Sequence, residues 1–480
     1  MKCSVVGWLN GLLVAWSGLS LFASTPAMAA DWLQFRGPNA AGHAAGGEPY
    51  PTEIGPDSHV IWKTDLPPGH SSPVVTEKQI FVTAAQNERL VTIALDRTTG
   101  RQQWLVEAPH GKREDIHSIG SHAQSTPASD GQMVVSFFGS CGLLAYDLSG
   151  KELWRVAMGP FNNDFGAASS PIIVDDLVIL SQDHDTDSFL MAVDKRSGKT
   201  VWRTERGEFP RGFATPVIWT NNGQKQIVIA GTLRVVGYDL KTGKEAWTVR
   251  GISRTVCATP VVGADGNLYL AGWSAGGDPG ERIRVEPFDT LVVQADKNKD
   301  GALVEDELPE GAIRQRFSQV DRNNDQRLTR VEYEFFRSLF DQSQNVVIAI
   351  RPGPMGDASE SHVIWRQDRH VPFCASPLWA NDLVFTIRDG GILASLDAKT
   401  GKLVKQSRLA ATNNYYASPV LAGGNIYLLN DEGKLTVVSG QGAWKVVHTA
   451  DFGQPTYATP AAVDGRIYLR TATALYCFGQ

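Results

Sequence analysis

Two short acidic segments in the second half of the chain carry the residue types best suited to chemistry. In the first, oxygen-bearing groups fall at positions 1, 3, 5, 7 and 12 of the stretch from 296 to 307. These groups belong to Asp296, Asn298, Asp300, the main chain of Ala302, and Glu307. A ring of carboxylate, amide and carbonyl oxygens suits a hard cation. With Gly301 at the sixth position, where the chain must turn sharply, the spacing predicts a Ca²⁺-binding loop of the EF-hand type.

A second segment of the same length, from 321 to 332, keeps the ligand pattern but not the glycine. Its candidate ligands are Asp321, Asn323, Asp325, the main chain of Arg327, and Glu332. Gln326 stands at the sixth position, and forcing its side chain to positive φ costs on the order of 1 kcal/mol. We therefore expect weaker binding, and whether this loop binds calcium by itself stays open. For the first segment the alternative is a relic loop held by its apolar contacts.

The elements that position these segments follow from a dipeptide that recurs along the chain. After the first thirty residues, Ser-Pro or Thr-Pro occurs with prolines at 73, 127, 171, 216, 260, 377, 419 and 460. Most intervals are 41 to 45 residues, a period typical of propeller blades or solenoid units. The interval from 260 to 377 is 117 residues, so it must contain an insertion. Both acidic segments lie inside it.

Each repeat reads as four short strands joined by tight turns. In the unit that begins at Thr215, strands are predicted near 216–219, 226–230, 233–239 and 245–249. An Ala-x-Asp-x-x-Thr-Gly-Lys-x-x-Trp pattern recurs across the third turn. The Gly supplies positive φ and the Asp can accept bonds from turn amides, while the Trp is predicted to pack between neighbouring blades.

This pattern resembles the pyrroloquinoline-quinone-type propeller repeat, the family that includes quinoprotein alcohol dehydrogenases and the outer-membrane protein assembly propeller. The resemblance covers roughly Ser58 to the C-terminus apart from the insertion, and Asp31 to Pro38 resembles the opening of many secreted proteins with this repeat. It implies an all-β, eight-bladed β-propeller of four-stranded antiparallel blades. The last repeat has three strands, and the stretch from His59 to Thr64 can supply the fourth. We therefore expect N- and C-terminal strands to close the ring together.

The chain divides accordingly. Residues 1–30 are typical of a signal peptide, because Lys2 precedes a long apolar run and an Ala-Met-Ala site. An uncleaved membrane anchor is the alternative. Residues 31–57 form an N-terminal extension, 58–272 and 346–480 form the propeller, and 273–345 form a small α-helical EF-hand insertion in the fifth blade. The residues Val331, Phe335, Phe336 and Leu339 after the second loop are spaced for one apolar helix face.

Topology places a second group of candidate residues at one mouth of the axial funnel. If strand one of each blade starts at Ser/Thr-Pro, the loops before this dipeptide and those between strands two and three share a face, which the insertion must overhang. The residues expected at this mouth are His70, His122, Gln124, Asp164, Asp183, His184, Asp185, Arg211, Arg254, Tyr415, Tyr416 and Tyr457. Such a mouth could bind an anionic or aromatic ligand or a peptide. The alternative is that arginines and aspartates pair across the funnel while the aromatic rings pack blade edges.

Two further groups carry weaker signals. His110, His117 and His122, with Asp115, have a spacing without defined metal geometry, so we favour a hydrogen-bonded loop. Beyond Cys3 in the signal segment, the cysteines are Cys141, Cys257, Cys374 and Cys477. We expect buried free thiols; in an oxidising compartment they could pair, but spacing assigns no connectivity.

The formal net charge of −6 comes without a basic stripe, which argues against nucleic acid as a partner. We expect a periplasmic or secreted protein, without a transmembrane anchor after signal cleavage. It would act as a binding or scaffolding propeller that takes a protein or small-molecule ligand at the funnel face, beneath a Ca²⁺-binding module.

The alternative is a pyrroloquinoline-quinone-dependent dehydrogenase of alcohols or sugars. The resemblance implies for such enzymes a quinone in the funnel with Ca²⁺, a catalytic Asp, and a disulfide between adjacent cysteines. This chain has no adjacent cysteines and its blades are minimal in length, so we favour the scaffold. A third possibility is a partner-holding role like that of the outer-membrane assembly propeller, although no Cys at the cleavage site offers a lipid anchor.

Overall fold

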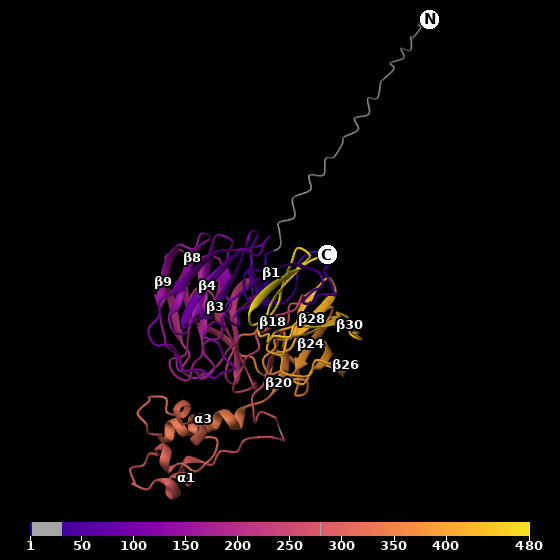
Figure 1. The fold of residues 1–480 in the computed structure, drawn as a ribbon. Helices are drawn as coiled ribbons and strands as arrows, with labels where there is room; N and C mark the ends of the chain where they lie inside the picture. The colour runs from indigo at the N-terminus through magenta and orange to yellow at the C-terminus, as the bar shows by residue number, and fades with distance from the viewer. Residues whose placement is uncertain (2–30, 279) are drawn as a thin grey trace.

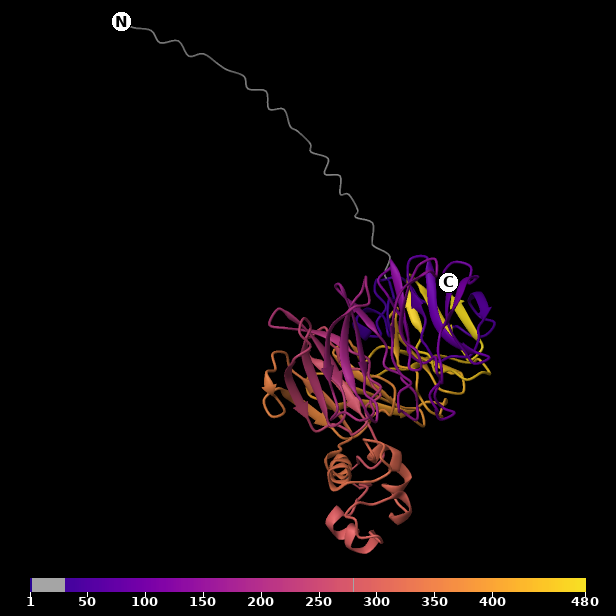
Figure 2. The same ribbon diagram turned by 90° about the vertical axis from the view of Figure 1, so that its left-hand side faces the viewer.

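The computed structural model describes residues 1, 31–278 and 280–480. Apart from Met1, the predicted signal peptide lies outside the described residues. The chain forms one propeller, and a helical lobe hangs from one of its faces (Figures 1 and 2). Within the described part, no helix has the length and apolar character needed to cross a membrane.

Eight sheets radiate around one axis, and each recurring Ser/Thr-Pro precedes the innermost strand of a blade, as predicted. Blades 1 and 2 are β2 (Val74–Val75), β3 (Gln79–Gln86), β4 (Arg89–Asp96), β5 (Gln102–Ala108), β6 (Ala128–Ser129), β7 (Met133–Phe138), β8 (Gly142–Asp147) and β9 (Glu152–Ala157). Blades 3 and 4 are β10 (Ile172–Val174), β11 (Leu177–Gln182), β12 (Phe189–Asp194), β13 (Thr200–Glu205), β14 (Val217–Asn221), β15 (Gln224–Ala230), β16 (Arg234–Asp239) and β17 (Glu245–Arg250).

The second half of the ring repeats this order. Blades 5 and 6 are β18 (Val261–Val262), β19 (Leu268–Gly272), β20 (Val346–Ile350), β22 (Val363–Gln367), β23 (Leu378–Ala380), β24 (Leu383–Arg388), β25 (Ile392–Asp397) and β26 (Leu403–Arg408). Blades 7 and 8 are β27 (Val420–Ala422), β28 (Asn425–Leu429), β29 (Lys434–Ser439), β30 (Val446–Asp451), β31 (Ala461–Val463), β32 (Arg466–Arg470), β33 (Ala474–Phe478) and β1 (Val60–Asp65). β1 pairs antiparallel with β33, from Val60 opposite Phe478 to Asp65 opposite Ala474, so the predicted closure is confirmed.

The Ser and Thr residues of the recurring dipeptide form a closed ring of hydrogen bonds around the axis. In each blade the main-chain N–H of this residue donates to the side-chain hydroxyl of its counterpart in the next blade, at 2.9–3.1 Å. The eighth bond, from Thr459 N–H to Ser72 Oγ, returns to blade 1. All eight residues are only 1–2% exposed. The repeated hydroxyl therefore fixes the innermost positions of adjacent blades to one another.

At the outer edge, tryptophans join neighbouring blades as predicted. Trp202 of blade 3 donates from Nε1 to Leu240 O of blade 4 at 3.1 Å, and its ring covers Gly243. The φ of Gly243 is 68°, and a Cβ there would lie 2.3 Å from the ring, so both the turn and the packing require glycine. Equivalent contacts are made by Trp62, Trp104, Trp154 and Trp365.

Blade 5 departs from this pattern. The segment 352–360, which lies between the third and fourth strands of this blade, contains β21 (Gly356–Asp357). This strand pairs in parallel with β17 and adds a fifth strand to blade 4. Trp247 accordingly stays within its own blade, edge-on to Trp219 at 5.7 Å between ring centroids.

The N-terminal extension ties together blades that are far apart in the ring. Trp32 pairs with Val75 of blade 1, Ala44 N–H donates to Leu421 O of blade 7, and Arg36 Nη2 donates to Pro377 O of blade 6. Val75, Leu421 and Pro377 each come after the Ser or Thr of the recurring dipeptide in their blades. The extension therefore crosses the axis on the side of the hydroxyl ring away from the loops that precede the dipeptide.

The insertion lies between β19 and β20 and has its own apolar core. It contains α1 (Phe288–Ala295), η2 (Glu305–Glu307), η3 (Arg314–Arg316), α2 (Phe317–Val320) and α3 (Arg330–Gln342). Of the predicted apolar face of α3, Phe336 and Leu339 are buried, but Val331 is 78% exposed. Tyr333 and Phe340 complete the buried face, and Tyr333, Phe336 and Phe340 have the i, i+3, i+7 spacing of one helix side.

Candidate functional site

A cavity of about 600 Å³ lies on the propeller axis. Its lining includes all eight hydroxyl-ring residues, Phe35 of the N-terminal extension, and Gln315, Arg316 and Gln319 of the insertion. Loops that precede the dipeptide form its walls. The insertion therefore overhangs this mouth, as the strand order predicts.

Seven of the residues predicted for the funnel line this cavity: His70, Gln124, Asp164, Arg211, Arg254, Tyr416 and Tyr457. The other five, which are His122, Asp183, His184, Asp185 and Tyr415, do not. Their side chains are occupied by contacts within and behind the loops.

The acidic cluster behind the cavity consists of ion pairs. Asp183 accepts two hydrogen bonds from the buried Arg206, at 2.7 and 2.8 Å, and Asp185 binds Arg211 at 2.5 and 2.9 Å. The guanidinium of Arg206 also lies over the ring of Phe209. These pairs correspond to the alternative in which Arg and Asp neutralise one another.

The remaining three residues are held by packing or by main-chain groups. His184 stacks on Phe161 at 3.9 Å, neither ring nitrogen has a hydrogen-bond partner, and burial lowers its pKa to about 3. Tyr415 donates its hydroxyl to Ala411 O at 2.6 Å, and His122 Nε2 lies 2.9 Å from Glu114 O. All three therefore support the loops rather than face the cavity.

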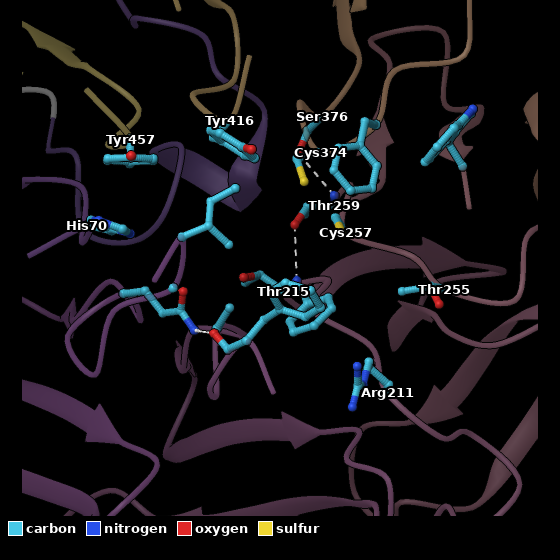
Figure 3. Close-up of a pocket in the computed structure, with 18 of the residues that line it drawn as sticks. His70, Arg211, Thr215, Thr255, Cys257, Thr259, Cys374, Ser376, Tyr416 and Tyr457 are labelled. Atoms are coloured by element: carbon cyan, nitrogen blue, oxygen red, sulfur yellow. Dashed lines mark hydrogen bonds between the residues drawn. The ribbon is translucent and has the colours of Figure 1, made fainter. Parts of the chain in front are cut away.

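Flat aromatic surfaces form one wall of the cavity (Figure 3). His70 stacks on Tyr457 at 3.9 Å between ring centroids, and Tyr416 lies 5.5 Å from Tyr457. Burial, and secondly the charge of Arg470, lower the pKa of His70 to about 4, so the imidazole is neutral at physiological pH. This wall offers apolar faces without a charge.

Three arginines converge on the opposite part of the cavity, and only one is matched by carboxylates. Burial lowers the pKa of Arg211, but Asp185 and Asp164 outweigh burial and leave it raised. For Arg254, burial followed by the charges of Arg316 and Arg211 lowers the pKa to about 10. Burial and the charge of Arg211 likewise lower the pKa of Arg316.

Arg254 is held in place without being neutralised. Its guanidinium lies over the ring of Phe340 at 4.5 Å, and Nη2 donates to Ala275 O at 3.3 Å. Its Nε is buried and has no hydrogen-bond partner. Arg316 donates to Ala312 O, and among the described residues neither Arg254 nor Arg316 has a carboxylate within ion-pairing distance. An anionic group in the cavity would supply the missing charge.

The hydroxyl ring adds hydrogen-bond donors at the cavity floor. Each ring oxygen accepts one main-chain N–H, and within the described part of the chain none of these hydroxyls donates to a protein acceptor. Their protons are therefore free for oxygen acceptors of a ligand or for water.

Several lining residues were missed by sequence reasoning: Phe35, Ile119, Cys257, Trp273, Arg316 and Cys374. Trp273 packs edge-on against Phe373 at 4.9 Å. Each of the two cysteines stands two residues before Ser/Thr-Pro, and in blade 4 this relative position is held by Phe213, which also lines the cavity. Alignment of the repeats on the dipeptide could therefore have found both cysteines. Nothing in the repeat points to Phe35 or Arg316, which come from outside it.

The two acidic loops of the insertion share one hydrogen-bond pattern. In the first, Asp296 accepts the amide of Gly301 at 2.9 Å, and Glu307 accepts those of Lys297 and Val304. In the second, Asp321 accepts the amide of Gln326 at 2.8 Å, and Glu332 accepts those of Arg322 and Thr329. The φ of Gln326 is 65°, close to the 81° of Gly301, so the positive φ expected there is present.

The other predicted ligands occupy the same loops: Asn298, Asp300, Ala302, Asn323, Asp325 and Arg327. Leu303 and Leu328 join the loops through two main-chain hydrogen bonds, at 2.8 and 3.1 Å. Among the described residues, no three or more His, Cys, Asp or Glu side chains are grouped closely enough to hold a metal ion. That finding includes the cluster around His117. The loop carboxylates are instead turned toward loop amides.

Comparison with known proteins gives one family and a set of similar folds. The family model described as "Outer membrane protein assembly factor BamB" matches residues 55–162, 120–272 and 342–478. BamB from Moraxella catarrhalis is 14% identical at a TM-score of 0.55, over 88% of this chain and 99% of that one. The quinohemoprotein alcohol dehydrogenase from Comamonas testosteroni is 12% identical at a TM-score of 0.55, over 95% of this chain and 81% of that one. No curated protein matches the sequence.

Proposed function

The chain belongs to the family described as outer membrane protein assembly factor BamB, and from this premise we propose a binding and scaffolding propeller whose funnel holds an acidic segment of a protein partner. The observation that carries the proposal is the pair Arg254 and Arg316, which face one cavity without carboxylates of their own among the described residues. One arginine belongs to the propeller and the other to the insertion. An acidic segment would therefore be held between the two parts.

The cavity suits such a segment in shape as well as charge. A volume of about 600 Å³ accommodates a few side chains rather than a folded domain. Arg254 is already ordered by Phe340 and Ala275, so binding a carboxylate costs little further side-chain entropy. The stacked rings of His70 and Tyr457 offer an apolar face for an aromatic side chain beside the carboxylate.

Fluorescence polarisation with a labelled peptide that alternates aspartate and phenylalanine tests this proposal. Arg254→Met and Arg316→Met should each weaken binding by about 10- to 100-fold, because each removes a charge-assisted hydrogen bond from a buried site. Arg155→Met is the matched control, since Arg155 lies on β9 and pairs with Glu152 outside the cavity. Equal affinities for all three variants would contradict the proposal.

The dehydrogenase alternative needs groups that the cavity lining does not offer. In the quinoprotein dehydrogenases that the repeat resembles, the quinone is accompanied by Ca²⁺, a catalytic Asp and a disulfide of adjacent cysteines. Asp164 is the one carboxylate among the described lining residues, and it is bound by Arg211 at 3.1 Å and by Gln319 at 3.1 Å. Cys257 and Cys374 come from different blades rather than from adjacent positions. The lining therefore does not fit the calcium-bound quinone.

A direct titration separates the two functions. The purified protein is mixed with pyrroloquinoline quinone and Ca²⁺, and the cofactor absorbance is followed together with dye reduction in the presence of alcohols and aldose sugars. We expect no turnover. Stoichiometric quinone binding with substrate-dependent dye reduction would establish the enzyme and overturn the scaffold.

We also propose that both loops of the insertion bind Ca²⁺. Their shared hydrogen-bond pattern, including positive φ at Gly301 and Gln326, supports this proposal. Arg327 pairs with Asp300 at 2.9 Å across the two loops, and its charge would oppose a cation there. We therefore expect the weak, structural type of affinity, on the order of 0.1 to 1 mM.

Calorimetry with Ca²⁺ tests this assignment loop by loop. Glu307→Gln and Glu332→Gln should each remove one bound ion, because each replaces the bidentate ligand at the last loop position. Glu305→Gln is the control, since Glu305 is exposed and lies at a position that supplies no ligand. An unchanged stoichiometry in either ligand variant would refute the assignment of that loop.

We further propose that the protein is exported to the periplasm or secreted. This proposal is supported by the signal-like segment at the N-terminus and by the name of the family, which refers to the outer membrane. N-terminal sequencing of protein recovered from the periplasmic fraction should find a start near Asp31. Recovery of uncleaved protein from the cytoplasm would contradict export.

A further inference from the structure

Two cysteines face each other in the wall of the funnel cavity. Cys257 stands two residues before Thr259 of blade 5, and Cys374 stands two residues before Ser376 of blade 6. The hydroxyl ring joins these positions directly, because Thr259 N–H donates to Ser376 Oγ at 3.0 Å. Figure 3 draws the two sulfurs next to this hydrogen bond. Equivalent positions of adjacent blades therefore place two thiols together, although 116 residues separate them in the chain.

The two cysteines are neighbours but are not bonded to each other. All four cysteines of the described chain are free. The neighbouring Cys257 thiol, and secondly burial, raise the pKa of the Cys374 thiol well above its ordinary value. Cys141 and Cys477 belong to blades 2 and 8, away from this pair.

We propose that Cys257 and Cys374 form a reversible disulfide that links blade 5 to blade 6 inside the funnel. Their equivalent positions in adjacent blades, the hydrogen bond between those blades and their place in one cavity wall bring the two sulfurs near one another (Figure 3). The product is uncharged, so the buried site accepts it without the desolvation that a pair of thiolates on a metal ion would require. The surroundings therefore favour a disulfide over a dithiolate metal site.

The cavity gives an oxidant access to the pair. Cys257 lines the cavity and is partly exposed. Its thiolate attacks one sulfur of a disulfide oxidant, so an S–S bond forms to the protein and one thiolate leaves. The Cys374 thiolate then attacks Cys257 Sγ and releases the second oxidant thiol. Overall, two thiols lose two protons and two electrons, and the oxidant disulfide is reduced to two thiols.

The disulfide would also affect the insertion. The helical lobe is carried by the second and third strands of blade 5, and the disulfide would link blade 5 covalently to blade 6. Disulfide formation between Cys257 and Cys374 does not require an acidic partner, and it is measured separately from peptide binding.

Thiol counting on the full chain tests the proposal. Protein purified under reducing conditions is equilibrated with glutathione disulfide, blocked with iodoacetamide in denaturant, and analysed by intact and peptide mass spectrometry. We expect the loss of two hydrogen atoms, two alkylated cysteines at Cys141 and Cys477, and a linked pair of peptides containing Cys257 and Cys374. Dithiothreitol should restore four alkylation sites on the mature chain.

Variants locate the link. Cys257→Ser and Cys374→Ser should each abolish the cross-linked peptide, whereas Cys141→Ser should leave it unchanged; circular dichroism checks that each variant is folded. Four alkylated cysteines after oxidation would overturn the proposal. A persistent glutathione adduct on Cys257, or a link to Cys141 or Cys477, would overturn it equally.

Discussion

We predict that Thr215→Val, which removes one hydroxyl of the ring, measurably lowers the free energy of unfolding. Thr215 Oγ1 accepts the main-chain N–H of Ser170 at 3.1 Å, and both residues are 2% exposed. Valine keeps the β-branched shape, so the change removes the acceptor without opening a cavity. Valine offers the Ser170 N–H no acceptor, and an unsatisfied buried donor costs about 1–3 kcal/mol. For a chain of this length, that loss lowers the melting temperature by roughly 1–3 °C.

Two measurements are needed because a large propeller can unfold in several steps. Guanidinium denaturation followed by tryptophan fluorescence gives the free energy of unfolding, and hydrogen exchange reports protection of the Ser170 amide. Thr400→Val is the control, since the Thr400 hydroxyl bonds Asp397 in an exposed turn where water replaces it. We expect the control within about 0.5 kcal/mol of wild type. If Thr215→Val matches the control in stability and keeps the Ser170 amide protected, the ring does not stabilise the fold as argued.

Three further predictions concern a buried ion pair, the pH dependence of stability and Ca²⁺ affinity. Asp183→Ala should destabilise the protein by about 3–5 kcal/mol by leaving Arg206 charged and unpaired, and the double variant with Arg206→Met should cost less in denaturation. The pKa of His70, near 4, lies below its ordinary 6.5. Its contribution to stability is therefore complete above about pH 6.5, is lost as pH falls toward 4, and amounts to about 3 kcal/mol. His70→Phe should flatten the stability profile in that window. Arg327→Ala should raise the calorimetric Ca²⁺ affinity by about 2- to 10-fold, because it removes a neighbouring positive charge.

Much of the ring could be predicted from the sequence because each blade repeats a local pattern. The Ser/Thr-Pro spacing counts the blades, and the recurring Asp, Gly and Trp mark the third turn. Both depend on contacts within a blade or with the next one, as Trp202 and Gly243 illustrate. Closure by β1 followed from the strand missing after Phe478. The dipeptide's closed hydrogen-bond ring did not follow, because its donors and acceptors lie in different blades.

The cavity was harder to predict for the same reason. Phe35 and Arg36 belong to no repeat, and they contact blades that lie far along the chain. Arg316 reaches the funnel only because of the way the insertion packs, with Phe340 against Arg254. The funnel aspartates show the opposite case, in which the residue types were found but Asp183 is bound to a buried arginine behind the wall. Side-chain type alone does not distinguish a lining group from a supporting one.

Ring closure also constrains when the protein can fold. Among the described strands, β1 is synthesised first and its partner β33 last, so the eighth blade cannot form until residue 478 has been made. The N-terminal extension must also wait for later parts of the chain before it can dock, since Arg36 and Ala44 bind blades 6 and 7. These long-range contacts slow folding and leave an open sheet edge on the nascent chain. The N-terminal segment therefore makes its stabilising contacts late in folding. Loss of β33 would leave β1 without its partner and open the ring.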